Sequence, residues 1–407
     1  MALSRHYSQR NLDEYFDGIG KLLGRSERRA HFAMYALGLL SKIPRKSLEP
    51  IAELAAKGSP DVCEKLHQGL IHFSNSSPWP DEEVRKYATD YALPELLGQE
   101  HLDALIIDDT GFIKQGTHSV GVQRQYTGTA GKITNCQVAV SLTVATRMEH
   151  LPLDFQLYLP QKWADDPERR RVAKIPDSVK FTVKVDMALQ MIRAALDRGI
   201  PKAMVAADSF YGTDKYFRGE LTELGLVYAV GIHNDQKVQR VLSRGLSDTM
   251  SVKELALSLG RNRFKYVEWK EGTKGTLYSY FARVRVRIAN PDCREPEEQT
   301  LLVEWPLEEK EPKHYTLLTI PRKTKLKEMV RKTKARWHIE QSYEEMKGEL
   351  GLDHFEGRSW IGWHHHISIT LACYSLVQAC KWRAFSPSPG RKTTGGAIAT
   401  TSSAPRC

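Results

Sequence analysis

The chain has 407 residues, of which 41% are hydrophobic and 27% are charged, and lysine and arginine outnumber aspartate and glutamate by 59 to 49. This length suits two or three domains, and the composition is that of a folded protein rather than a disordered chain. The net charge of +10 favours a polyanionic partner such as nucleic acid, although charge alone fits a generally basic protein equally well.

The sequence also predicts an intracellular protein without a membrane segment. Its first residues, MALSRHYSQRNLDEY, are polar and do not resemble a secretory signal peptide. The longest apolar run, residues 367–380, is too short to span a bilayer. The six cysteines contain no C-x-x-C pair, which is typical of isolated thiols in a reducing compartment. We therefore expect a cytoplasmic location.

Residues 1–98 are predicted to form a helical N-terminal region. Apolar residues recur at helical spacing in HFAMYALGLLSKI and SLEPIAELAAK, and SNSSPWPDEE is a loop that ends at a helix start. This region carries no catalytic motif. It is compatible with binding DNA or with dimerisation, and the sequence does not decide between them.

Residues 99–232 have the pattern of a mixed α/β domain. ALIIDD, SVGVQRQY and CQVAVSLTVAT are strand-like, and the turn TGTAGK joins the last two in a meander. DMALQMIRAALDRGI is an amphipathic helix, AMVAAD is a second buried strand, and a further helix and strand follow.

The remaining chain divides into a β-rich insertion, a second helical part and a tail. Residues 233–321 contain the strand-like segments YSYFARVRVRIA, TLLVEW and HYTLLTI. Residues 322–385 are predicted to be helical, ending in HHISITLACYSLVQACKW. Residues 386–407 are of low complexity, and we expect them to be disordered.

Three acids occupy positions that suit catalysis. Asp109 is predicted to end the first strand and Asp208 a later strand, while Glu340 is predicted in the middle of a helix. Strand ends of a mixed sheet collect ligands, and carboxylates there can hold divalent ions that promote phosphoryl transfer. Each acid alone is more commonly structural, since aspartates cap turns and helical glutamates are usually solvated. The prediction therefore depends on the combination.

The predicted helix that carries Glu340 has a cationic stripe. Arg336 and Lys347 flank Glu340 at spacings of four and seven residues, which place all three on one helix face. Trp337 is adjacent, and the preceding segment RKTKLKEMVRKTKAR is strongly basic. We predict that Arg336, Trp337 and Lys347 bind DNA, because a phosphate backbone would fit such a face. The alternative is an ordinary i,i+4 ion pair with a nearby lysine.

At this point the residues resemble a known family. Arg336-x3-Glu340-x6-Lys347 is similar to the Y-x2-R-x3-E-x6-K signature of DDE-type bacterial insertion-sequence transposases, and IIDDTGF and VAADSFYG resemble the segments around their first two acids. VGVQRQYTGTAGKITNCQVAV, LYLPQKW and HFEGRSWIGWHHH add to a resemblance that covers roughly residues 20–380. Thr333 stands where the signature has tyrosine.

The resemblance implies an RNase H-like core whose triad, Asp109, Asp208 and Glu340, is split by the β-rich insertion. It implies that these acids hold two Mg²⁺ ions, with Mn²⁺ as a substitute. The implied reaction is cleavage of DNA at transposon ends and transfer of the 3′-hydroxyl into target DNA. The implied partner is double-stranded DNA, with a homodimer in the DNA complex, at the bacterial nucleoid.

Two smaller groups of residues have competing interpretations. The resemblance implies a base-stacking tryptophan; Trp337 is the leading candidate and Trp269 and Trp305 are weaker ones, and such a tryptophan is as often buried core. The run His364–His366 could suggest a metal site, but consecutive side chains point in different directions. We therefore prefer a role at a helix start for this run.

The neighbouring acids Asp108 and Asp109 should point to opposite faces of the sheet, since side chains alternate along a strand. Apolarity does not choose between them, because Leu105 and Ile107 are as apolar as Ala104 and Ile106. The resemblance selects Asp109, because in related transposases the catalytic aspartate directly precedes threonine. Asp108 would then bond locally or support the site.

Two other functions remain open on the sequence. One is a metal-dependent nuclease of RNase H fold that hydrolyses DNA without joining it. The other is a domesticated, non-catalytic DNA-binding protein. Loss of a triad acid would favour the second, and none is lost.

Overall fold

The computed structural model describes residues 2–98, 100–272 and 275–385, and the structural statements below concern these residues. The tail that we predicted to be disordered, residues 386–407, lies outside them. The helices are α1 (Ala2–Leu23), α2 (Ser26–Leu40), α3 (Leu48–Ala56), α4 (Pro60–Asn75), α5 (Asp81–Leu97), α6 (Gln161–Ala164), α7 (Pro167–Val172), α8 (Lys184–Asp197), α9 (Ser209–Gly212), α10 (Lys215–Glu223), α11 (Val252–Ser258), the 3-10 turn η1 (Arg261–Arg263), α12 (Leu326–Lys334), α13 (Trp337–Leu350) and α14 (Trp360–Phe385).

The strands belong to one large mixed sheet. They are β1 (Ala104–Ile113), β2 (Gln123–Thr127), β3 (Lys132–Ala145), β4 (His150–Leu157), β5 (Met204–Ala207), β6 (Tyr228–Gly231), β7 (Lys237–Val241), β8 (Leu246–Ser251), β9 (Lys265–Gly272), β10 (Gly275–Ile288), β11 (Gln299–Trp305) and β12 (His314–Leu318). The order is β2-β3-β1-β5-β6-β12-β11-β10-β7-β8, with β4 on β3 and β9 on β10.

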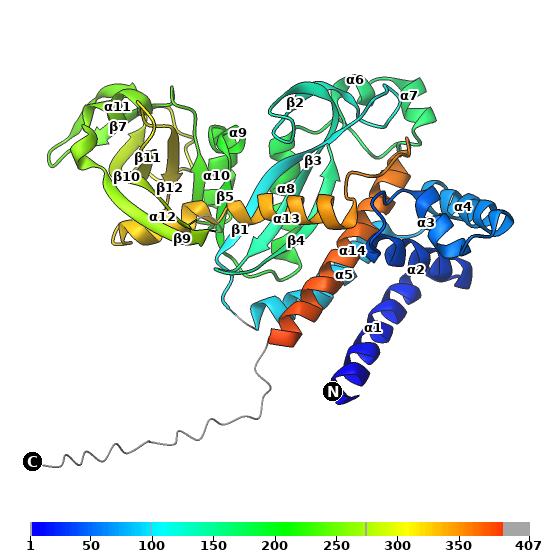
Figure 1. Ribbon diagram of the computed structural model, residues 1–407. Coiled ribbons are helices and arrows are strands. Elements are labelled where there is room, and N and C mark those ends of the chain that lie inside the picture. The colour runs from blue at the N-terminus through cyan, green and yellow to red at the C-terminus, as the bar shows by residue number, and fades with distance from the viewer. Residues whose placement is uncertain (1, 99, 273–274, 386–407) are drawn as a thin grey trace, which may run out of the picture.

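The sheet joins the core to the insertion. β1, β5 and β6 are parallel neighbours, whereas β6 pairs antiparallel with β12, which comes from the end of the insertion. Figure 1 shows the insertion strands as a lobe on one side of the core and α1–α4 on the other, with α13 crossing between them. The predicted fold class, a mixed α/β sheet with flanking helices, a β-rich insertion and N-terminal helices, is confirmed.

The N-terminal helices pack on the last helix. α5 lies along α14, and Tyr15, Phe32 and Tyr35 are buried in the shared core. The Tyr15 hydroxyl donates a hydrogen bond of 2.8 Å to the carbonyl of Ala372. The N-terminal region is therefore anchored to α14, and its predicted role in DNA binding stays a prediction.

β1 has helices on both faces. Ile106 and Phe112 belong to the apolar core that includes α13 and α14, whereas Leu105 and Ile107 belong to the core that includes α8 and α10. Burial on both sides explains the unbroken apolar start of this strand, because neither face is left to water. The strand extends to Ile113, since β3 pairs with its whole length.

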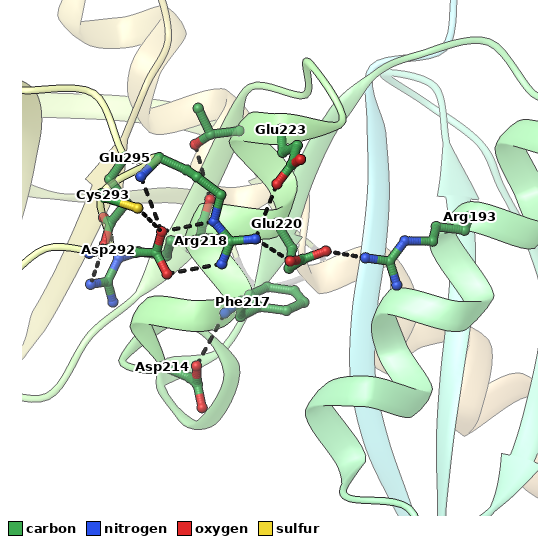
Figure 2. A network of polar contacts seen from close by, with 11 residues as sticks. Arg193, Asp214, Phe217, Arg218, Glu220, Glu223, Asp292, Cys293 and Glu295 are labelled. Atoms are coloured by element: carbon green, nitrogen blue, oxygen red, sulfur yellow. Dashed lines mark hydrogen bonds and ion pairs between the residues drawn. The ribbon is translucent and has the colours of Figure 1, made fainter.

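A buried ion-pair network ties the insertion to the core (Figure 2). Arg218 of α10 binds both carboxylate oxygens of Glu295, at 2.7 and 3.0 Å, and the two side chains are 1% and 0% exposed. Glu295 lies in the loop between β10 and β11. Nearby, Arg294 of the same loop and Arg193 of α8 both pair with Glu220 of α10. Breaking a buried pair of this kind is expensive, because it leaves one charge uncompensated.

Candidate active site

A pocket of about 500 Å³ opens where the core sheet meets the insertion. Asp208 and Glu340 line it, together with Arg336 and Trp337 at the start of α13. The insertion contributes further polar lining residues, Glu304, Lys313, His314 and Thr316. Two of the predicted catalytic acids therefore share one pocket with two of the predicted DNA-binding residues.

Asp208 follows β5 directly and is fixed by the turn that it begins. Its Oδ1 accepts hydrogen bonds from the backbone nitrogens of Phe210, at 2.9 Å, and Tyr211, at 3.4 Å, so it caps the short helix α9. This turn packs against β6 so closely that a Cβ on Gly231 would lie 2.8 Å from the nitrogen of Ser209. The capping role expected of a strand-end aspartate is therefore present, and the same turn faces the pocket.

Glu340 lies in the first turn of α13, not in the middle of the helix as the sequence pattern suggested, because the helix begins only at Trp337. Its Oε1 is 2.5 Å from Nη2 of Arg336, so the i,i+4 ion pair is present. Nη1 of the same guanidinium is 2.6 Å from Oδ2 of Asp108 in β1. Arg336 therefore bridges Asp108 and Glu340, which are far apart in the sequence.

The two aspartates of β1 lie inside the strand, and the prediction that Asp109 ends it is wrong. Pairing with β3 continues through both acids as far as Ile113. Because side chains alternate along a strand, Asp108 lies on the face of β1 that packs against α13, whereas Asp109 lies on the face that packs against α8. The prediction that they point to opposite faces agrees with their partners, since Asp108 contacts Arg336 and Asp109 contacts Lys184 at the start of α8.

Each of these aspartates is buried beside a cation. Burial raises the pKa of Asp108 to about 7; the charge of Arg336 opposes this rise, and the charge of Asp208 adds to it. Burial also raises the pKa of Asp109, and the charge of Lys184 opposes this rise. The Lys184 ammonium and the Tyr211 hydroxyl both donate to the Asp109 carboxylate. Both carboxylates therefore have a strong preference for a nearby positive charge.

The acids suit a hard cation in their chemistry, but a guanidinium lies between two of them. Carboxylate oxygens are the ligands that Mg²⁺ prefers. In the described ranges, no group of three or more acidic, histidine or cysteine side chains is close enough to enclose a metal ion. The structure brings Asp208 and Glu340 into one pocket and joins Asp108 to Glu340 through Arg336. Asp109 instead bonds Lys184 and Tyr211, and the backbone of Tyr211 also bonds Asp208.

The other predicted DNA-binding residues differ in exposure. Trp337 is 44% exposed and lines the pocket. The Lys347 ammonium donates to the carbonyl of Gly111, at 2.9 Å, and to Oγ1 of Thr129, at 3.1 Å, and burial lowers its pKa. Lys347 therefore connects α13 to β1 and to the turn after β2.

The weaker tryptophan candidates are more enclosed than Trp337. Trp305 is 8% exposed, and the Arg261 guanidinium lies 4.9 Å from its ring centroid. Trp269 is half-buried and has the Lys334 ammonium 4.7 Å from its ring centroid. The pocket lining includes neither of them.

The histidine run lies in the first turns of α14, and each histidine has its own backbone partner. The rings of His364, His365 and His366 bond to carbonyls of Trp360, Ser74 and Gly351, respectively. Burial lowers the pKa of each to about 4, so they are neutral at physiological pH. These contacts join the start of α14 to neighbouring segments.

Sequence reasoning missed two polar neighbours of the β1 acids. Tyr211 lies three residues after Asp208, so the short VAADSFYG turn offered a local clue to its position. Lys184 had no such signal, because it meets Asp109 only through the packing of α8 on the sheet.

The mixed sheet, its flanking helices and the carboxylates around the start of α13 define an RNase H-like DDE domain. In comparisons with known proteins, a family model described as DDE superfamily endonuclease matches residues 15–276, and one described as Transposase DDE domain matches residues 183–376. A curated relative, the "Probable transposase for insertion sequence element IS701" of Microchaete diplosiphon, is 31% identical over 229 residues. The chain belongs to the DDE superfamily, and it is similar to insertion-sequence transposases.

The match to the relative covers part of each protein. It includes 56% of this chain and 55% of the relative, so the chain spans about half the length of the curated protein that it matches. Within the described residues, none of the helices has the length and apolarity needed to cross a membrane.

Proposed function

We propose that the chain is a metal-dependent transposase that cleaves double-stranded DNA at the ends of its element and transfers the freed 3′-hydroxyl into target DNA. The observation that carries this proposal is the pocket in which Asp208 and Glu340 lie beside Arg336 and Trp337. Family membership supports it independently. The place of action would be the nucleoid of the bacterial cytoplasm, with a homodimer on the DNA.

Asp208, Glu340 and one aspartate of β1 would hold the divalent ions, with Mg²⁺ as the natural choice and Mn²⁺ as a substitute. When bound, such ions activate the attacking hydroxyl and stabilise the charge on the reacting phosphate. The contacts support Asp108 as the β1 ligand, because it faces α13 and shares Arg336 with Glu340. This assignment departs from the sequence prediction of Asp109, which remains the competing prediction.

Arg336 would hold the site together before DNA and metal arrive. Its guanidinium lies between Asp108 and Glu340 and offsets part of their negative charge, which lowers the repulsion between them. When divalent ions supply that charge, the guanidinium can turn to a DNA phosphate, to which it would bind in a bidentate manner. Trp337, at the rim of the pocket, would stack on a base, and Lys347 would keep α13 seated on β1.

The test uses the purified full-length chain and linear DNA that carries the ends of its element. We expect nicks and joined products with Mg²⁺ or Mn²⁺, binding without reaction with Ca²⁺, and no reaction with EDTA, since Ca²⁺ has looser coordination. Glu340→Gln should abolish cleavage and keep DNA binding. Nicks without joined products from pre-cleaved ends would instead indicate a nuclease, and binding without any nicks would indicate a DNA-binding protein only. Activity in EDTA would overturn the metal mechanism.

A further inference from the structure

We propose that a cationic groove on the insertion binds the backbone of the duplex that flanks the scissile bond; this inference rests on the proposed function. The groove has a volume of about 520 Å³. Its cationic lining residues are Arg240, Arg263, Lys265, Arg283, Arg285 and Lys325. The described lining includes no acid, and its other members are apolar.

The cations converge from segments that are distant in the sequence. Arg240 comes from β7, Lys265 from β9, Arg283 and Arg285 from β10, and Lys325 from the segment that leads into α12. Bringing like charges together in one groove costs electrostatic energy. The repulsion between these cations is relieved when a polyanion binds to them. A duplex backbone is such a polyanion, because it presents phosphates at regular spacing.

The groove contrasts with the network of Figure 2, in which arginines meet carboxylates. Among the described residues, the ion pairs made by the groove cations are limited to Arg285 with Glu298, at 3.3 Å. Arg283 donates to the carbonyl of Thr324, at 2.6 Å, and remains exposed. Arg263, Lys265 and Lys325 are also exposed. The insertion therefore pairs its arginines on the side that docks on the core and leaves charge available in the groove.

The groove lies next to the candidate active site on the insertion sheet. Phe281 lines both pockets. It pairs with Glu304 of β11, which lines the active-site pocket, and side-chain alternation puts Arg283 and Arg285 on the same face as Phe281. α12 packs on β9 and β10, between the two hollows. DNA whose scissile phosphate enters the pocket would reach the groove by passing α12.

The shape of the charge favours a duplex over a small anion. One phosphate group is held by two or three donors that converge on a point, whereas these cations are distributed over several strands and a loop. Lys327 of α12 is a further exposed cation near the groove, whereas Lys334 at the other end of this helix is paired with Glu304, at 2.7 Å. Contacts of this kind position a duplex without reading its sequence.

The test measures binding of the double variant Arg263→Gln/Lys265→Gln to three duplexes by fluorescence anisotropy over a range of salt concentrations. The first duplex ends at the scissile bond, the second carries a flank of about 15 base pairs, roughly one and a half helical turns, and the third is unrelated DNA. A matched control, Lys162→Gln/Arg171→Gln, removes the same charge from exposed positions on α6 and α7.

We expect the groove variant to lose about 0.9 from the log–log salt slope for each lost phosphate contact on the flanked duplex, and to keep the slope on the duplex that ends at the scissile bond. Unrelated DNA should also show a loss, because backbone contacts do not read sequence. The control should behave as the unmodified chain. An unchanged slope on the flanked duplex would overturn the groove, and so would an equal loss on the duplex that ends at the scissile bond. If the double variant has a lowered melting temperature, Lys325→Gln, in the segment before α12, serves as the second variant. Cleavage in Mg²⁺ with an unchanged slope would refute the groove while leaving the proposed function standing.

Discussion

At the scale of residues, the most informative contact is the bridge that Arg336 forms between Asp108 and Glu340. The ion pair of Arg336 with Glu340 follows from helical spacing, because residues four apart are neighbours on a helix. The ion pair of Arg336 with Asp108 does not, since the two residues meet only after β1 and α13 have packed. The bridge is thus a structural reason to propose Asp108, whereas the resemblance selects Asp109.

The first prediction concerns this pair. Asp108→Asn should lose cleavage by several orders of magnitude, because the variant removes the β1 carboxylate on the face of Glu340. Asp109→Asn should keep measurable cleavage, because its carboxylate instead bonds Lys184 and Tyr211. The measurement is the rate of nicking of element-end DNA in Mg²⁺, with melting temperatures of both variants as a control. The reverse order of activities would assign the metal to Asp109, as the resemblance predicted.

At the scale of elements, α14 shows how a buried histidine can stabilise a helix junction. His366 is fully buried, and its Nε2 donates to the carbonyls of Gly351 and Leu352, both at 3.1 Å, while Tyr35 bonds its Nδ1. Burial lowers its pKa to about 4, below the value of about 6.5 expected in an unfolded chain.

This shift predicts a pH dependence of stability. Between about pH 4 and 6.5 the unfolded chain binds a proton that the folded chain excludes, so the contribution of neutral His366 is complete above pH 6.5 and is lost as pH falls. His366→Gln should therefore reduce the slope of unfolding free energy against pH by about 1.4 kcal/mol per unit in this window. Urea unfolding between pH 4.5 and 8 measures it. His118→Gln, at an exposed site, should leave the slope unchanged; equal slopes for all three proteins would contradict the prediction.

Some of the helices and strands could be predicted from the sequence, and others could not. The helical N-terminal region, the strands β1–β3 and the strand before Asp208 follow from local periodicity, which is largely a property of neighbouring residues, whereas β4 was not predicted. The length of β1 does not, because its continuation past Asp109 depends on pairing with β3. The ion pair of Lys184 with Asp109 also depends on tertiary packing, and no local sequence pattern could have predicted it.

At the scale of the whole molecule, core and insertion share one sheet and one buried ion-pair network. Arg218 anchors the loop of Glu295, and it also donates to the carbonyls of Gly212 and Thr213 at the end of the turn that Asp208 begins. Contacts of the insertion therefore reach the segment that carries Asp208, one of the proposed metal ligands.

This arrangement predicts that Arg218→Met lowers the free energy of unfolding by about 3–5 kcal/mol, because Glu295 is left buried without a partner. The double variant Arg218→Met/Glu295→Leu should recover part of that loss, since both charges are then absent. Urea unfolding of the single and double variants checks both statements. A single variant that loses less than about 1 kcal/mol, the usual value of a surface pair, would show that the network is not a structural anchor.

The position of β12 has a consequence for synthesis on the ribosome. β6 ends at Gly231, but its second neighbour, β12, begins only at His314, and α13 with Glu340 follows later still. Until β12 emerges, the nascent chain presents an open strand edge, which is a template for aggregation. A product truncated within the insertion would keep both aspartate segments yet lack the glutamate and expose that edge. Such a fragment would be prone to aggregate through that edge.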